Sequence, residues 1–229
     1  MADVGAAYAD GRRRVTDLLR STDDLEATGR TPVPACPGWT VADVVGHLTG
    51  ICADVLAGNM DGVATEPWTD TQVAARRPTP LDDVLAEWSE IAPKVESLAG
   101  GFGEAGGQWV GDFVTHEHDV RGALGRPGAR DSDAVRVGLG FMVPGYLAAV
   151  SQRSLPTLAV VVDDERWTSD ETSPPAATLA APPFEVMRSL TGRRSADQVR
   201  ALPWAGDADP YLPALAWGPF TPPVGPLRE

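Results

Sequence analysis

The stretch CPGWTVADVVGHLTGICADVLAG, residues 36–58, contains a turn, a helix start and a helix end in one continuous piece. The Pro-Gly pair at 37–38 favours a turn, Thr40 is a good N-cap, and Gly58 favours helix termination. Between these signals the apolar residues recur at helical spacing, at Val44, Val45, Leu48, Ile51 and Val55. The stretch therefore predicts an amphipathic helix, with His47 at the border of its apolar face.

Four further stretches show helical spacing of apolar residues, over 3–20, 81–98, 108–124 and 132–150. Between them, residues 58–79 form a long polar link with prolines, which predicts a crossover connection in a helical bundle. After residue 154 the pattern changes to short β-branched runs, TLAVVVDDERWT and AATLAAPP, and then returns to helix. We therefore predict a mainly α chain, with a helical bundle over 1–150 followed by a smaller α+β domain over 151–229.

The composition excludes several function classes. The chain has 19 Lys and Arg against 32 Asp and Glu, a net charge of −13, so nucleic acid and anionic membrane surfaces are not expected as partners. We identify no apolar run as long as a membrane span and no signal peptide, and we expect a cytoplasmic protein, monomeric or homodimeric. Two cysteines are too few for a disulfide framework. The bias toward Arg, Ala and Gly is typical of a high-GC genome.

The chain has three histidines, and two of them lie in GDFVTHEHDV, residues 111–120. Asp112 and His116 are four residues apart on a predicted helix, so their side chains project from the same face. His118 lies two residues further on and projects from another side, so we expect it to be incidental. His47, from a different helix, is the natural third member of a site with two His and one carboxylate.

Three ligands of this type suit a divalent transition metal, with zinc as the first choice, and leave one coordination position open for chemistry. The residues alone leave a second interpretation open. A carboxylate and a histidine four apart are also common as a solvated pair, and a histidine at the edge of an apolar face is often a hydrogen-bonded core residue.

The phrases VPACPGWTVADVVGHLTG and DFVTHEHDVRGALGRP resemble the mycothiol-dependent maleylpyruvate isomerase family, within the DinB-like group of metal-binding helical bundles. In that family a Cys-Pro-Gly-Trp-Thr turn leads into a helix with the first His ligand. A later helix carries Glu-x-x-x-His followed by Asp. His47 and His116 match the two histidines, Asp119 matches the trailing Asp, and Asp112 stands where the family has Glu. The module that accompanies this bundle in the family resembles a stretch near the C-terminus of the chain, LTGRRSADQVRALPWAGDADPYL.

The resemblance implies a DinB-like four-helix bundle whose metal binds the thiol of mycothiol, a small-molecule cosubstrate, and lowers the pKa of that thiol. The thiolate then attacks a small electrophilic substrate, which makes the protein an isomerase or an S-transferase. Asp112 is one methylene shorter than Glu, so the ion has to sit closer to the helix or bind more weakly. A thiol-independent metal hydrolase and a non-catalytic binding module stay open as alternatives.

Three other positions are candidates for supporting roles. Asp119 shares the face of Asp112 and His116, and it either orients a ligand histidine or is a plain surface charge. Arg193 and Arg194 are adjacent donors that either bind a substrate carboxylate or form a salt bridge to the helical domain. Cys36 has no CxxC partner, and we expect a packed turn residue more than a nucleophile.

Overall fold

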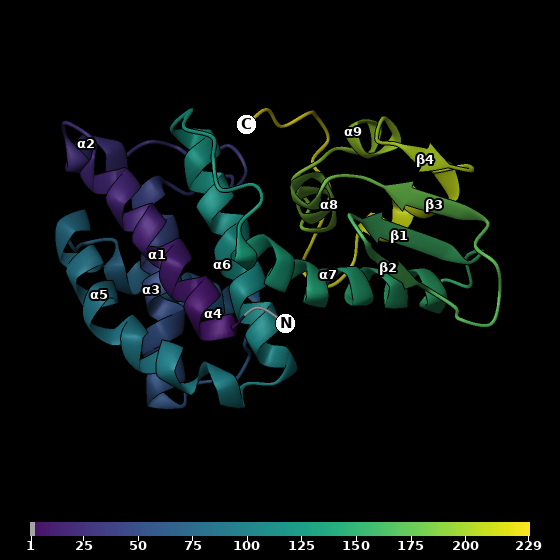
Figure 1. Cartoon of the computed structure of the whole chain (residues 1–229). Helices are drawn as coiled ribbons and strands as arrows, with labels where there is room; N and C mark the ends of the chain where they lie inside the picture. The colour runs from purple at the N-terminus through teal and green to yellow at the C-terminus, as the bar shows by residue number, and fades with distance from the viewer. Residues whose placement is uncertain (1–2) are drawn as a thin grey trace. The chain divides into compact units, whose positions relative to one another are not determined.

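The computed structural model describes residues 3–229 and divides into two compact units (Figure 1). The first unit extends to Gly128 and includes Glu229, and the second is Ala129–Arg228. The chain is mainly α-helical, with one small sheet in the second unit, so the predicted fold class is confirmed.

The first unit is a bundle of four long helices: α1 (Val4–Arg20), α3 (Val41–Ala57), α5 (Leu81–Leu98) and α6 (Glu104–Ala123). Shorter helices α2 (Leu25–Gly29), α4 (Glu66–Arg76) and η1 (Ala99–Gly101) lie between them in sequence. Helix α1 packs on α5 and α6, and α3 packs on α4 and α5. Thr40 and Asp43 form a capping box that starts α3, and Gly58 ends it in the left-handed conformation, as the sequence predicts.

Aromatic side chains fill the centre of the bundle and hold α6 against α1. The Tyr8 and Trp109 rings stack with centroids 3.8 Å apart, and Tyr8 also contacts Phe113. Gly11 allows this close approach, because a Cβ atom there would lie 2.1 Å from the Phe113 ring. Helix α6, which carries two of the predicted ligands, is therefore fixed by well-packed aromatic contacts.

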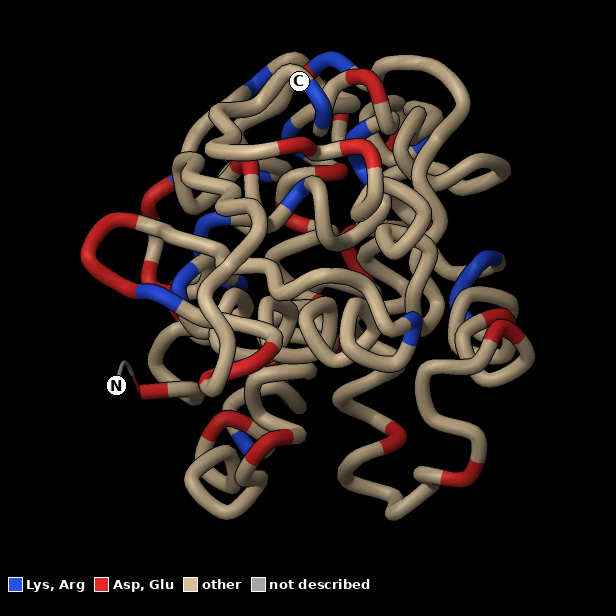
Figure 2. The backbone as a smooth tube through the Cα atoms, turned by 90° about the vertical axis from the view of Figure 1, so that its right-hand side faces the viewer, with Lys and Arg blue, Asp and Glu red and all other residues tan. Residues whose placement is uncertain are grey.

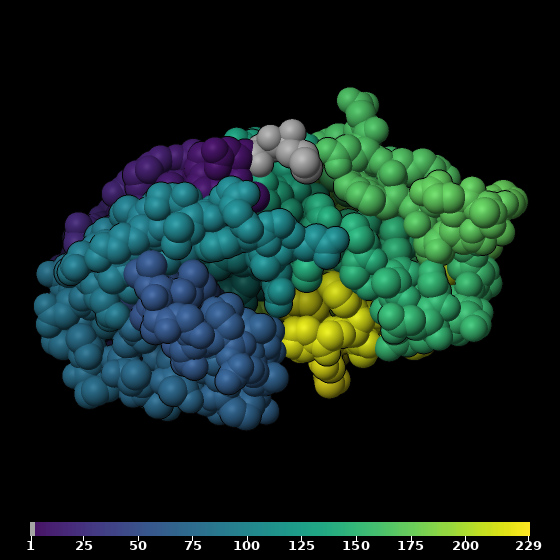
Figure 3. Space-filling model, turned by 90° about the horizontal axis from the view of Figure 1, so that it is seen from below, coloured from purple at the N-terminus to yellow at the C-terminus, as the bar shows by residue number. Residues whose placement is uncertain are grey.

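The prediction of a polar link without a helix over 58–79 is wrong, because helix α4 lies within this segment. It packs on α3, where a Cβ atom on Gly50 would lie 2.5 Å from Gln72 Cβ and one on Gly46 would lie 3.3 Å from Arg76 Cβ. Only Trp68, Gln72 and Val73 of α4 are buried. The helix therefore has too narrow an apolar face to be recognised by spacing, and it depends on tertiary contacts with α3. The blue segment of Figure 3, which includes the exposed residues before α4, lies at the surface.

The second unit combines helix α7 (Asp133–Gln152) with a four-stranded sheet in the order β2-β1-β3-β4. Strand β1 (Leu158–Val162) pairs antiparallel with β2 (Glu165–Thr168) and parallel with β3 (Ala177–Ala180), and β3 pairs antiparallel with β4 (Trp204–Ala205). Helices α8 (Pro183–Leu190) and α9 (Ala196–Arg200) and the 3-10 helix η2 (Asp209–Leu215) complete the unit. We predicted a boundary near residue 150, whereas the compact units divide before α7, because α7 packs on α8, η2, β1 and β2.

Among the described residues, α7 alone has the length and hydropathy of a membrane span, which the sequence analysis did not anticipate. Of its most apolar 18-residue window, 56% is buried inside the protein, and a core helix of a globular protein gives the same pattern.

Acidic positions are spread along the chain and not confined to one segment (Figure 2).

Candidate metal centre

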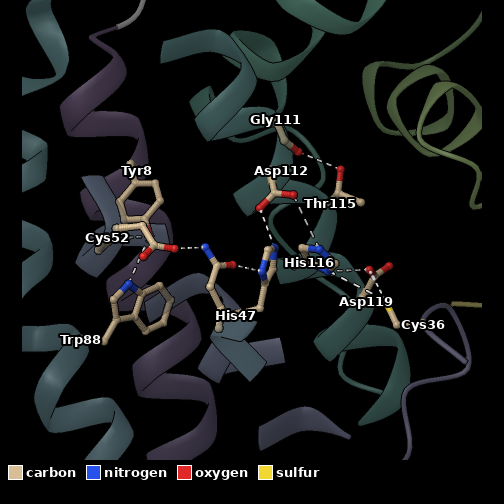
Figure 4. A network of polar contacts seen from close by, with 12 residues as sticks. Tyr8, Cys36, His47, Cys52, Trp88, Gly111, Asp112, Thr115, His116 and Asp119 are labelled. Atoms are coloured by element: carbon tan, nitrogen blue, oxygen red, sulfur yellow. Dashed lines mark hydrogen bonds and ion pairs between the residues drawn. The ribbon is translucent and has the colours of Figure 1, made fainter. Parts of the chain in front are cut away.

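Helices α3 and α6 bring His47, Asp112 and His116 together, as the sequence predicts (Figure 4). His47 and His116 are 3% and 7% exposed, and Asp112 is half-buried. His47 Nε2 lies 3.4 Å from Asp112 Oδ2, and His116 Nε2 lies 3.7 Å from Asp112 Oδ1. One donor atom from each of the three side chains lies within 4.8 Å of the other two.

These separations fit a metal ion better than a hydrogen-bonded cluster. Donor atoms about 2.0–2.1 Å from a tetrahedral zinc ion are about 3.4 Å apart. A direct N–H···O hydrogen bond is about 2.9 Å long, which is shorter than either distance from Asp112 to a histidine nitrogen. The donor set, two imidazoles and one carboxylate, is also one that zinc accepts at catalytic sites. The residues present therefore fit the metal that the sequence analysis predicts.

The other nitrogen of each histidine has an acceptor of its own. His116 Nδ1 lies 3.0 Å from Asp119 Oδ2, and His47 Nδ1 lies 2.8 Å from Gln72 Oε1. Both contacts are buried, and the carboxylate of Asp119 can only accept, so His116 Nδ1 donates to it. Nε2 of each ring is the nitrogen that faces Asp112.

The Cys-Pro-Gly-Trp turn forms a wall of this site. Gly38 has a φ of +86°, which glycine adopts without strain, and the next residue, Trp39, contacts both histidines. The Trp39 ring stacks on His116 at 5.8 Å between centroids and is tilted against His47 at 5.4 Å. The same turn lines an open surface hollow of about 520 Å³, with walls from Pro32, Val33, Pro34, Pro37, Gly38, Trp39 and Thr40. Trp39 therefore contacts both histidines and also lines this hollow.

Cys36 lies on the far side of His116, where it belongs to a second group of metal-type donors. Its Sγ is 3.2 Å from Asp119 Oδ2 and 3.8 Å from His116 Nδ1. Asp119 is 1% exposed, so the alternative of a plain surface charge is excluded by its burial. His118 is buried on α6 but belongs to neither donor group found among residues 3–229.

A buried ion cluster next to the site fixes the rotation of α6. Glu117, which is fully buried, accepts two hydrogen bonds from Arg14 of α1, at 3.0 and 2.7 Å. It also accepts two from Arg121, one helical turn later, at 3.1 and 3.0 Å. Because Glu117 and Arg14 join α6 to α1, the neighbouring His116 is held on the face that meets α3.

Arg193 and Arg194 follow α8 in the second unit. Arg194 forms a two-point ion pair with Glu185 of α8, with N–O distances of 2.8 and 3.2 Å. Arg193 Nη1 donates to the backbone oxygen of Thr191. The assignment of these arginines to a substrate carboxylate stays a prediction.

A model of one protein family, described as the mycothiol maleylpyruvate isomerase N-terminal domain, matches residues 8–126. This match covers just over half of the chain. The chain belongs to the mycothiol maleylpyruvate isomerase family. No curated protein and no solved structure gives a significant match.

The family match spans nearly all of the first unit and ends before Ala129. His47, Asp112, His116 and Asp119 all lie within it, whereas Arg193 and Arg194 lie outside it. Gln72 also lies inside the match, and the sequence analysis missed it. The proline at the start of α4 is a local sign of a helix there, but three buried side chains are too few for their spacing to single out Gln72.

Proposed function

We propose that this member of the mycothiol maleylpyruvate isomerase family binds a divalent transition metal, zinc by preference, through His47, Asp112 and His116. Mycothiol is then its thiol cosubstrate, and a small electrophile is its substrate. The observation that carries the proposal is the convergence of both Nε2 atoms on the Asp112 carboxylate, at 3.4 and 3.7 Å. Three electron-pair donors aimed at one point repel one another unless a cation lies between them.

A bound ion with one open position supplies Lewis-acid chemistry, because it lowers the pKa of a thiol and so provides thiolate at neutral pH. The chain contributes the remaining parts. The Nδ1 contacts of His47 and His116 hold both rings in place, and the Asp112 carboxylate offsets one positive charge of the ion. Trp39 covers one side of the histidine pair and limits access of water.

The thiolate adds to one carbon of an electron-poor double bond of the substrate, and the π electron pair moves onto the electron-withdrawing group as an enolate. If the enolate expels the thiolate after rotation about the former double bond, the double bond re-forms with the other geometry and the protein is an isomerase. If the enolate instead takes up the proton that the thiol released, the thioether persists and the protein is an S-transferase. The hollow along the Cys-Pro-Gly-Trp turn supports a small substrate, because its volume of about 520 Å³ lies within the range of small-molecule sites.

Elemental analysis of the purified protein tests the metal site. We expect close to one equivalent of metal, which His47→Ala and His116→Ala both abolish. His118→Ala is the matched control, since His118 is equally buried on the same helix and lies outside the donor group. Equal metal content in all three variants would overturn the site.

Cobalt substitution tests the thiol chemistry. Addition of mycothiol, or of a simpler thiol at high concentration, to the cobalt form should produce a thiolate-to-cobalt charge-transfer band in the near ultraviolet. A thiol-independent hydrolase keeps water at the open position and gives no such band. Normal cobalt binding without any response to thiols would therefore leave the metal site intact and remove the thiol from the proposal.

A further inference from the structure

The orientation of His47 depends on a residue from a helix that carries no ligand. Gln72 of α4 is 3% exposed, and its Oε1 lies 2.8 Å from His47 Nδ1. Its Nε2 lies 2.6 Å from Asp54 Oδ2. Asp54 comes from α3, two turns after His47, and its other oxygen accepts from Asn59 Nδ2 at 2.9 Å. Four side chains therefore form one hydrogen-bonded chain that ends at the candidate metal ligand.

Asp54 decides which way the Gln72 amide points. A carboxylate only accepts hydrogen bonds, so the Gln72 group that faces it has to be the NH₂ donor. The opposite orientation would place two oxygens 2.6 Å apart, in a part-buried position where such repulsion is poorly screened. The amide oxygen therefore faces His47, and it can only accept. His47 Nδ1 must then carry the proton.

The packing of α4 on α3 keeps Gln72 at this distance. A Cβ atom on Gly50 would lie 2.5 Å from Gln72 Cβ and 2.7 Å from Gln72 Cγ, so the contact requires glycine. Glycine inside a helix costs about 1 kcal/mol relative to alanine, and α3 carries this cost one turn after His47. A residue whose role was only to fill the core would not need both a fixed amide direction and this close approach.

We propose that Gln72, oriented by Asp54, is a positioning residue that fixes His47 as the Nδ1–H tautomer and so directs the Nε2 lone pair to the metal. This inference rests on the proposed function in one respect only, which is that His47 Nε2 binds a metal ion. It differs from the arrangement at His116, where a carboxylate, Asp119, contacts Nδ1 directly. The amide transmits the orienting effect of Asp54 without placing a second negative charge against His47.

Histidine NMR of the metal-free protein tests the tautomer without any metal or activity. The chain has only three histidines, so ¹⁵N–¹H correlations can be assigned with single variants. In the neutral wild-type protein we expect His47 to be protonated at Nδ1. Gln72→Leu should shift the population toward Nε2–H and weaken zinc binding by about 10–100-fold. Thr71→Ala, an exposed neighbour on α4, is the matched control and should change neither readout.

A swap of the two side chains separates orientation from packing. Gln72→Glu alone sets two carboxylates against each other and should lower zinc affinity. The double variant Gln72→Glu/Asp54→Asn keeps an acceptor toward His47 and restores a donor–acceptor pair behind it, so it should retain the Nδ1–H tautomer and recover the zinc affinity that Gln72→Glu loses.

The outcomes distinguish this inference from the proposed function. An Nε2–H tautomer in the wild type, or an unchanged tautomer in Gln72→Leu, would overturn the role of Gln72 even if zinc binds. Absence of zinc binding together with the Nδ1–H tautomer would instead refute the metal site and leave the positioning intact. Should Gln72→Leu fail to fold, the wild-type tautomer and the double variant still decide the matter.

Discussion

The imidazole rings of His47 and His116 meet edge to face, with centroids 5.2 Å apart and ring planes at 81°. Two rings at this angle present their Nε2 atoms to the Asp112 carboxylate from different directions. Ligands around a tetrahedral ion have to arrive from well-separated directions, so the perpendicular arrangement suits coordination better than stacked rings would. The angle arises because the two histidines come from different helices, α3 and α6.

Asp112 offers a test of ligand length. Asp112→Asn should weaken metal binding, because a neutral amide oxygen is a poorer ligand than a carboxylate. Asp112→Glu restores the family's residue and should retain or improve affinity, since α6 presents the longer side chain from the same face. Competition titration with a chromophoric chelator measures both. A protein in which Asn and Glu variants bind metal equally well would show that the carboxylate is not a ligand.

Asp119 should support the metal through His116. Asp119→Ala removes the acceptor at 3.0 Å from His116 Nδ1 and should reduce metal affinity by about 10–100-fold. Cys36→Ala is the informative comparison, because Cys36 contacts the same carboxylate oxygen but leaves the His116 contact in place. The same competition titration should show little change for Cys36→Ala. An equal loss in both variants would instead assign Cys36 a direct part in binding the ion.

Glu117 should be important for stability. Glu117→Gln removes the shared carboxylate of Arg14 and Arg121, whose side chains are 29% and 12% exposed, so the cost should lie below that of a fully buried pair, at about 2–3 kcal/mol. Urea unfolding should show a decrease of that order in the free energy of unfolding of the first unit. Glu90→Gln, which removes only an exposed pair with Lys94, should change it by less than about 0.5 kcal/mol. Similar values for the two variants would contradict the assigned role of Glu117.

The buried thiol of Cys52 should lower the free energy of unfolding at alkaline pH. Burial, the largest effect, raises the pKa of the Cys52 thiol from 9.0 to about 11, and burial also raises the pKa of its partner Tyr8. Between pH 9 and about 11 the unfolded chain releases the thiol proton whereas the folded protein keeps it. Unfolding is therefore favoured as pH rises, by up to about 1.4 kcal/mol per pH unit for one group. Urea unfolding at pH 8, 9 and 10 measures this slope.

Cys52→Ala is the control for that slope. It removes the thiol but keeps the position apolar, so the decline of stability above pH 9 should become shallower than in the wild type. An identical decline in both proteins would show that other groups cause it.

The sequence predicted that the candidate ligands lie close together because helical spacing determines which side chains share a face; their role as metal ligands stays a prediction. Asp112, His116 and Asp119 are four and three residues apart, and His47 follows a recognisable helix start at Thr40. Gln72 could not be predicted in this way, because α4 buries only three side chains and its position depends on contact with α3. A pattern of residues indicates the structure of the segment in which it occurs. The contact between His47 and Gln72 joins residues 25 positions apart, so no such pattern predicts it.

The domain boundary was less predictable for a related reason. Helix α7 has apolar residues over most of its circumference, and such a helix gives no sign of which neighbours it packs against. Its apolar character suggested a fifth helix of the bundle, whereas the compact units divide before it and α7 packs in the second unit.

Gly50 has a consequence for how this protein can diverge. Any replacement adds at least a Cβ atom 2.5 Å from Gln72 Cβ, so α4 can stay in place only if position 72 becomes glycine, which has no Cβ atom. A smaller residue at position 72 would in turn give up the amide that faces His47. We therefore expect positions 50 and 72 to change together in evolution, and this covariation would reveal a constraint that the histidines alone do not record.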